Sequence, residues 1–286
     1  MLRTTLFTFL LMLAGAIGRA AAQAPPPGGP VTAAPATAGS IGNPAISIIG
    51  WFQAVAGNDP TLPAEAFALP EAELAFQAAV DPHSRAEFFL SAGHEGLEVE
   101  EGYLTWLALP GGGQAKFGKF RADLGKFNRT HPPETPFADR PLAAEAWLGE
   151  EGLATTGVSA SILIPNPANL YWDVIAQIGA APESLASPVF GPEGRRDVLA
   201  LGRTSLFIPF GESTDLNLGV SYTNARAHPA LRAEGERMRL GAADLTLRWK
   251  NPRRSIYRSL LVQVELLGAR KAIAVPNFFD IGMKTA

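Results

Sequence analysis

The feature that most constrains this chain is the alternation of apolar and polar residues in short runs between about residues 43 and 267. In the run 215–222, Leu216, Leu218, Val220 and Tyr222 alternate with polar residues and glycine. Side chains in a β-strand repeat every two residues, so the two sets point to opposite faces. The pattern therefore predicts two-faced strands rather than helices.

The alternating runs predict eleven strands. Around Glu100–Glu101 and Gly202–Ser205 the alternation is poor, which indicates β-bulges. A short helix is expected at residues 142–148. The expected strands lie at residues 44–54, 70–80, 84–92, 97–109, 113–121, 153–164, 168–179, 197–209, 214–223, 239–250 and 255–267.

The links between these strands alternate in length. The short links are rich in turn residues, and they lie at 81–83, 110–112, 165–167, 211–213 and 251–254. The long links lie at 55–69, 122–152, 180–196 and 224–238, and the short link at 93–96 is an exception. Bacterial outer-membrane barrels combine short periplasmic turns with long extracellular loops. We therefore expect an all-β, antiparallel transmembrane β-barrel.

The composition excludes several classes of protein. After the N-terminus no apolar run is long enough for a helical membrane span, although only 18% of the residues are charged. Cysteine is absent, which excludes disulfides, thiol nucleophiles and thiolate metal sites. A water-soluble antiparallel sheet with one solvated face would show the same alternation. A periplasmic β-protein therefore stays an alternative to the barrel.

The N-terminus is typical of an exported protein. Arg3, the apolar stretch 6–17 and the small residues 20–22 predict a cleaved signal peptide over residues 1–22. The Pro-, Ala- and Gly-rich residues 23–42 are expected to be a disordered lead-in, and residues 43–286 the barrel. Cleavage leaves a mature chain with more acidic than basic residues, which argues against a nucleic-acid partner.

The densest basic stretch of the sequence runs from residue 116 to residue 140. The link at 122–152 is too long for a structureless connection, so we expect it to fold into the barrel and narrow the lumen. Its charges would then contact solutes, or they would form salt bridges that pin the loop to the wall, and the two roles are compatible. The candidate constriction residues are Lys116, Lys119, Arg121, Asp123, Lys126, Arg129, Asp139 and Arg140.

The same stretch carries a family resemblance. Residues 118–121 (GKFR), Gly125 and residues 136–142 (PFADRPL) resemble the phosphate-selective porin O and P family. Its members carry a Gly-x-Phe-Lys-x-Pro-Phe-Gly strand end followed by an aromatic-x-Glu-Arg element. Asp123 and Leu124 replace the family's Pro-Phe, and no run of arginines matches its phosphate ladder. The resemblance implies a 16-stranded barrel, a homotrimer and passive solute passage, but not phosphate selectivity.

The expected barrel is incomplete. Single-chain bacterial barrels have even strand numbers, and an open sheet leaves backbone groups unpaired in lipid. The resemblance also implies a final strand that ends in an aromatic residue, whereas residues 278–286 end in Ala286. We therefore expect a C-terminally truncated barrel with about 11 of the 16 strands that the resemblance implies. Closure by a dimer is the alternative.

No motif predicts catalysis, a metal site or a cofactor. There is no nucleophile elbow of the G-x-S-x-G type. The acidic residues Glu98, Glu100 and Glu101 could bind a cation, but a solvated strand end is the simpler interpretation. The histidines lack metal-ligand spacing, and they lie in separate turns and links at His83, His94, His131 and His228.

We therefore expect a porin rather than an enzyme. It would contact the lipid of the bacterial outer membrane and pass small hydrophilic solutes or ions, and the basic stretch would favour anions. The alternatives are a non-functional barrel fragment, a ligand-binding receptor-like outer-membrane protein and a periplasmic β-protein. The lead-in is too short for the plug domain that a gated receptor carries.

Overall fold

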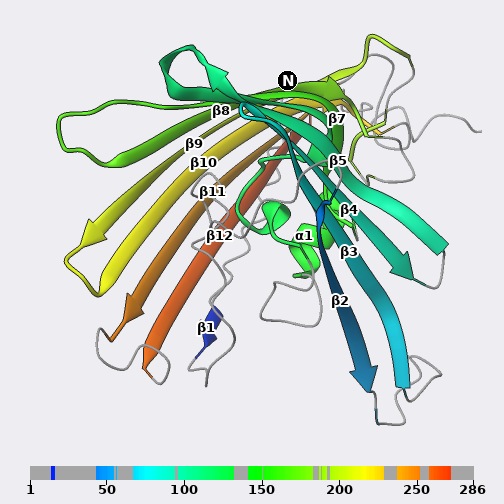
Figure 1. Ribbon diagram of the computed structural model, residues 1–286, viewed down its shortest axis with the longest axis horizontal. Coiled ribbons are helices and arrows are strands. Elements are labelled where there is room, and N and C mark those ends of the chain that lie inside the picture. The colour runs from blue at the N-terminus through cyan, green and yellow to red at the C-terminus, as the bar shows by residue number, and fades with distance from the viewer. Residues whose placement is uncertain are drawn as a thin grey trace, which may run out of the picture.

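The computed structural model describes residues 14–16, 43–54, 56, 67–93, 96–131, 141–149, 151–182, 187, 189–191, 194–228, 237–251 and 258–271. Strands β2 to β12 form one continuous antiparallel sheet in which neighbours in the chain are neighbours in the sheet (Figure 1). All eleven expected strands are therefore confirmed. They are β2 (Ala45–Ala54), β3 (Phe67–Asp81), β4 (Ser84–Gly93), β5 (Gly96–Leu109), β6 (Gly113–Arg121), β7 (Ala154–Leu163), β8 (Tyr171–Ala180), β9 (Val198–Phe210), β10 (Thr214–Arg226), β11 (Arg237–Lys250) and β12 (Ser259–Lys271).

Three further kinds of element accompany the sheet. The expected helix is confirmed as α1 (Leu142–Leu148), and single 3₁₀ turns occupy Pro110–Gly112 and Phe127–Arg129. Strand β1 (Ala14–Ala16) pairs with residues 261–263 of β12. It lies inside the predicted signal peptide; the rest of residues 1–42 falls outside the described residues. Within the described ranges, no helix combines the length and the apolar character that crossing a membrane requires.

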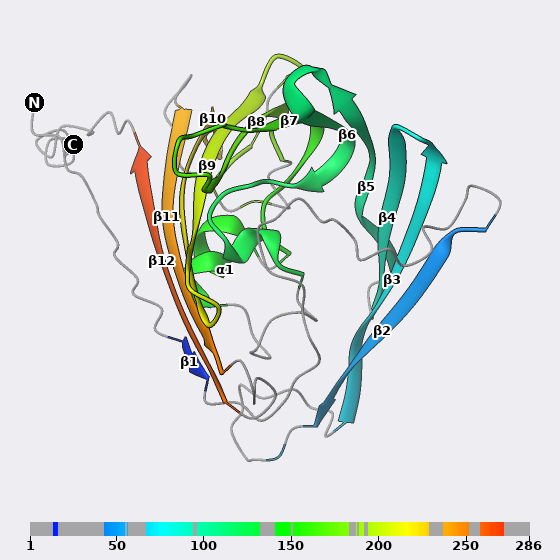
Figure 2. The same ribbon diagram turned by 60° about the vertical axis from the view of Figure 1, so that its left-hand side comes forward.

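The sheet is strongly curved, and α1 lies on its concave side (Figure 2). In the described residues the sheet ends at β2, which pairs with β3 alone, and at the short β1, which pairs with β12. The antiparallel all-β architecture is thus confirmed. The sheet is not closed, so the described residues form an arch.

The links sort by length as expected. Because successive strands are antiparallel neighbours, the links 82–83, 110–112, 164–170 and 211–213 all lie at one end of the sheet. The tight turn between β3 and β4 is closed by Asp81, whose carboxylate accepts from the backbone N–H of His83 at 2.7 Å and from the hydroxyl of Ser84 at 2.5 Å. The strand ends that the long links join lie at the opposite end of the sheet, which we call the long-loop end.

One of the two predicted bulges is present. The β4–β5 register passes from Phe89 opposite Glu101 to Leu90 opposite Val99, so Glu100 is the extra residue. The predicted irregularity at 202–205 is wrong, because β9 pairs with β8 and β10 without a shift.

The poor alternation in β9 has a different cause. Its concave side carries Leu201 and then Arg203, and both are buried. Leu201 packs in an apolar core and Arg203 binds a carboxylate. The strand therefore crosses from an apolar to a polar part of the same face.

Over much of the sheet, the two faces are the reverse of those of a water-soluble sheet. Along β10, Asn217, Ser221 and Thr223 are buried on the concave side, whereas the intervening Val220 is 58% exposed and Tyr222 is 50% exposed. A soluble sheet with one covered face buries its apolar side. Exposed apolar side chains recur across the sheet, among them Ile46, Ile48, Phe52, Phe67, Phe88, Leu97, Phe117, Ile178 and Phe210.

A small apolar core occupies the concave side at the long-loop end. There α1 and the residues around it contribute Leu124, Leu148 and Leu153, which pack against inward residues of β9–β12 such as Leu199 and Leu240. This core holds part of the long link 122–153 inside the curve of the sheet.

Candidate functional site

The link after β6 turns into the concave side of the sheet instead of leaving it. Gly125, with φ +66°, makes this turn possible, because a side chain there would be strained and would overlap the carboxylate of Glu265. Its N–H donates to the hydroxyl of Ser221 at 2.8 Å, and its carbonyl accepts from Nη1 of Arg203 at 3.1 Å. Strands β9 and β10 thus hold this residue. We call residues 122–131 the inner segment.

The buried carboxylate of Glu265 anchors the next two residues. Its Oε2 accepts from the backbone N–H of Lys126 at 3.0 Å and of Phe127 at 2.8 Å. The ammonium of Lys126 donates to the hydroxyl of Thr246 at 2.5 Å. Burial, together with the nearby charge of Arg248, lowers the pKa of Lys126 to about 8.

Asn128 joins the two ends of the long link. Its amide nitrogen donates to the carbonyls of Ala122 at 2.7 Å and of Leu153 at 2.8 Å. Its side-chain oxygen accepts from the N–H of Leu153 at 2.7 Å. The side chain is fully buried, so these three bonds satisfy backbone groups that water does not reach.

Asp123 ties the inner segment to β8. Its N–H donates to Oε1 of Gln177 at 2.9 Å, and its Oδ2 accepts from Nε2 of the same side chain at 2.5 Å. Its other oxygen, Oδ1, lies 2.6 Å from Nε of Arg129. Asp123 therefore fixes the position of Arg129 as well.

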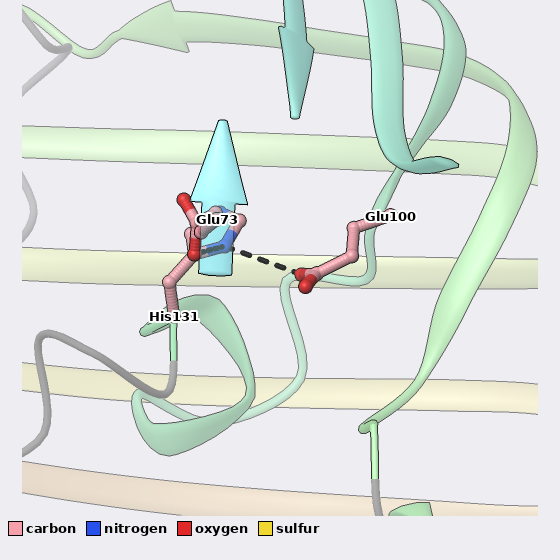
Figure 3. A group of neighbouring side chains, drawn as sticks. All are labelled: Glu73, Glu100 and His131. Atoms are coloured by element: carbon pink, nitrogen blue, oxygen red, sulfur yellow. Dashed lines mark ion pairs between the residues drawn. The ribbon is translucent and has the colours of Figure 1, made fainter. Parts of the chain in front are cut away.

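A second group of charges surrounds the end of the inner segment. Nδ1 of His131 lies 3.4 Å from Oε2 of both Glu73 and Glu100, and Nε2 lies 3.0 Å from Oε1 of Glu101. In Figure 3 the carboxylate of Glu100 points toward the imidazole, with Glu73 beside it. Together with Arg121 we call these residues the His131 cluster.

Arg121 and an aromatic ring complete the His131 cluster. Nη2 of Arg121 lies 2.5 Å from Oε2 of Glu100, and its Nε lies 3.6 Å from Oε1 of Glu101. Its Nη1 donates to the carbonyl of Glu151 at 2.5 Å. The ring of Phe89 stacks on His131 at a centroid distance of 4.8 Å.

The carboxylates hold His131 in its charged form. Burial alone would lower the pKa of the imidazole, but its interactions with Glu100, Glu101 and Glu73 outweigh burial and raise the pKa to about 11. His131 is therefore a cation at neutral pH and links the inner segment to β3 and β5.

A pocket of about 270 Å³ lies between the inner segment and the strand ends near the short turns. Both charge signs line it, and Nζ of Lys116 lies 4.5 Å above the ring of Tyr103 on its wall. The charged residues of this lining are Arg85, Glu87, Lys116, Asp123, Arg129 and Asp173.

The predicted constriction residues do not form one group. Lys116, Asp123 and Arg129 line the pocket, and Arg121 belongs to the His131 cluster. The side chain of Lys126 is buried between the inner segment and β11. Lys119 stands apart, with Nζ donating to the carbonyl of Val99 at 2.6 Å. Asp139 and Arg140 lie outside the described residues.

The sequence did not indicate that Glu73 and His131 belong to a charged cluster. Its simpler interpretation placed Glu100 and Glu101 at a solvated strand end. That interpretation is wrong for these two residues, which are 7% and 6% exposed. Their partner Arg121 comes from β6, so no local spacing links them. The signal that was available is the period-two pattern, which puts Glu73 on the polar face of its strand.

The comparisons with known proteins do not indicate a function for this chain. The chain matches no protein-family model. An uncharacterized protein from Aquifex aeolicus (strain VF5) is 32% identical to it over 166 residues, which are 56% of this chain and 35% of that protein. The chain thus spans about a third of the length of this relative.

Proposed function

We propose that this chain forms the wall of an outer-membrane barrel of the porin type, which passes small hydrophilic solutes along its concave side. The observation that carries the proposal is the reversal of the two faces: polar and charged side chains are buried on the concave side, and large apolar ones are exposed on the other. A transmembrane barrel has an apolar band toward lipid and a polar interior, so it requires this distribution.

The inner segment supports a restricted passage. A loop folded onto the inside of a barrel wall narrows the lumen and places charges where solutes pass. Here hydrogen bonds join the inner segment to the five strands β8 to β12, from Gln177 to Glu265, and His131 links it to β3 and β5. The passage would run through the pocket that Asp123 and Arg129 border.

The lining of the pocket favours weak charge selectivity. Three cationic side chains and three carboxylates face it, and Arg129 is already paired with Asp123. A balanced ring produces a smaller field than a ring of one sign. We therefore propose passage of small solutes of either charge, with at most a mild preference for anions from Lys116.

The proposal requires both ends of the sheet to be paired in the membrane. An unpaired strand edge in lipid leaves backbone N–H and C=O groups without partners, each at a cost of several kcal/mol. The described residues give β2 no second neighbour, and β1 covers only three residues of β12. Further strands or a second copy of the chain would satisfy these edges.

Solute release from liposomes tests the proposal. The full chain would be refolded in detergent and reconstituted into vesicles loaded with a small sugar and a large dextran. We expect loss of the sugar with retention of the dextran, relative to vesicles that received heat-denatured chain. Retention of both solutes by vesicles that carry folded chain would contradict the proposal.

A further inference from the structure

We propose that Glu73, Glu100 and His131 form a binding site for one divalent transition-metal ion of the zinc class. The inference concerns the His131 cluster alone and does not depend on solute passage. Each of the three residues offers one ligand atom, and these atoms all lie within 4.8 Å of one another.

The spacing of the atoms fits tetrahedral coordination. Zinc lies about 2.0–2.1 Å from a histidine nitrogen and about 2.0–2.2 Å from a carboxylate oxygen. Two ligands at such distances on a tetrahedral ion are separated by about 3.4 Å. Nδ1 of His131 lies 3.4 Å from Oε2 of Glu73 and 3.4 Å from Oε2 of Glu100. An ion among these atoms would need only small side-chain movements.

Two of the ligand atoms are buried and have no hydrogen bond. They are Oε2 of Glu73 and Nδ1 of His131, whereas Oε2 of Glu100 accepts from Nη2 of Arg121 at 2.5 Å. The residue Glu73 as a whole is only 6% exposed. Such groups are rare in folded proteins, because an unsatisfied buried polar atom is costly. A bound cation would satisfy both atoms at once.

The outer contacts of the imidazole are those of a metal ligand. A metal-bound histidine uses one nitrogen for the ion and donates the other N–H to a carboxylate or carbonyl. Nε2 of His131 lies 3.0 Å from Glu101, which leaves Nδ1 for the ion. Arg121 contacts both Glu100 and Glu101, and Phe89 stacks on the ring. The orientation of the ligand is therefore fixed before any ion arrives.

The charge and the donor set decide the class of ion. Three buried carboxylates face the guanidinium of Arg121 and the charged imidazole of His131, so the cluster carries one net negative charge. A divalent ion that displaced the imidazole proton would bring the charges into balance. Calcium and magnesium prefer sites made of oxygen atoms alone. An imidazole nitrogen with carboxylate oxygens suits zinc, cobalt, nickel or copper.

Cobalt(II) is the probe for the test, because its visible absorption reports a tetrahedral site. Folded full chain would be titrated with cobalt chloride and then with zinc chloride as competitor. We expect one cobalt ion per chain, displaced by zinc, with affinity at least 10-fold lower in Glu73→Gln and binding lost in His131→Gln. The matched control is Glu98→Gln, a carboxylate whose side chain is 70% exposed and 3.7 Å from Lys119, which should bind as the wild type does.

Three outcomes overturn the proposal: no saturable cobalt binding by the wild type, binding that survives His131→Gln, or equal loss in Glu98→Gln. Failure of the variants to fold does not leave the question open. Copper(II) bound to the wild-type chain would then be examined by pulsed electron paramagnetic resonance. Coupling to an imidazole nitrogen supports the site, and its absence refutes it.

Discussion

Arg203 on β9 and Asp244 on β11 form a buried ion pair that crosses over Gly219 of β10, the strand between them. Nη1 and Nη2 of the guanidinium lie 2.7 and 3.0 Å from the two carboxylate oxygens. A Cβ atom at position 219 would overlap both Nη2 of Arg203 and Oδ2 of Asp244. The pair therefore exists because residue 219 has no side chain.

Gly219→Ala should destabilise the fold by about 1–3 kcal/mol, the usual effect of adding a methyl group to a filled site. The new methyl group would displace a bidentate charge pair that also holds the carbonyl of Gly125. The matched control is Gly202→Ala on β9, where a Cβ atom meets nothing within 4 Å. Urea unfolding in detergent micelles would measure both variants. Equal stability of the two would contradict this account of the pair.

Asn128→Ala should release the long link from the wall. The substitution removes three hydrogen bonds. The carbonyls of Ala122 and Leu153 keep the backbone N–H of Leu124 and of Ala122 as partners, whereas the buried N–H of Leu153 is left without this one. We expect a loss of about 2–5 kcal/mol, because an unsatisfied buried group costs about 1–3 kcal/mol and each of the other two lost bonds about 0.5–1.5 kcal/mol. Limited proteolysis within residues 122–152 would show the release as faster cleavage.

The control for Asn128→Ala is Thr130→Ala. The hydroxyl of Thr130 makes a single long bond of 3.4 Å to the carbonyl of Lys126, so its loss should leave the cleavage rate within about twofold of the wild type. If both variants are cleaved at the wild-type rate, Asn128 does not hold the link.

The lowered pKa of Lys126 predicts that the stability of the fold increases with pH. Its pKa is about 8 in the folded chain and 10.5 in an ordinary environment, so between these values the folded state binds fewer protons than the unfolded state. The contribution of Lys126 to the free energy of unfolding is therefore lowest below pH 8. It rises between pH 8 and pH 10.5, by at most about 1.4 kcal/mol per pH unit. The charged groups that act on it are Arg248, Asp244, Arg203, Arg129 and, through its backbone, Glu265.

The measurement is the difference in unfolding free energy between wild type and Lys126→Met from pH 7 to pH 10.5. The unfolding free energy of the wild type should increase relative to that of the variant as the pH rises through this window. His131 titrates in both proteins, so its opposite contribution cancels in the difference. A difference that does not change with pH would show that Lys126 is not held in a perturbed state.

The outward face gives a prediction that separates a membrane wall from a soluble sheet. Val220 is exposed at the middle of β10, and Phe210 is exposed at the end of β9 beside a short turn. In a bilayer, Val220→Arg should cost about 2–4 kcal/mol and Phe210→Arg about 0–1 kcal/mol, because the cost of a charge falls toward the interface. Refolding into phosphatidylcholine vesicles with urea would measure both. Equal small effects would indicate that the face contacts water.

The strands were predictable because each carries its own signal. The alternation of 215–222 fixed both the element and the orientation of its faces, and turn residues such as Asp81 marked where strands end. The bulge at Glu100 was predictable as a break in that alternation. The irregularity in β9 was mistaken for a bulge, because the partners of Leu201 and Arg203 lie on other strands.

The candidate site was predictable only in part, for the same reason. Lys116, Asp123 and Arg129 were found because they lie in one basic stretch. The partners of the His131 cluster come from β3, β5, β6 and the inner segment, and only the curvature of the sheet brings them together. The sequence does not show which residues lie next to Glu73 in space, so nothing distinguished it from the other polar residues of the strands.

Single-channel recording tests the central claim, that the polar concave side forms a path across a membrane. The full chain, refolded in detergent, would be added to a planar lipid bilayer. The account predicts discrete ohmic steps, with a small reversal potential in a salt gradient because cations and carboxylates balance along the pocket. Folded chain that inserts into the bilayer without producing steps would contradict it.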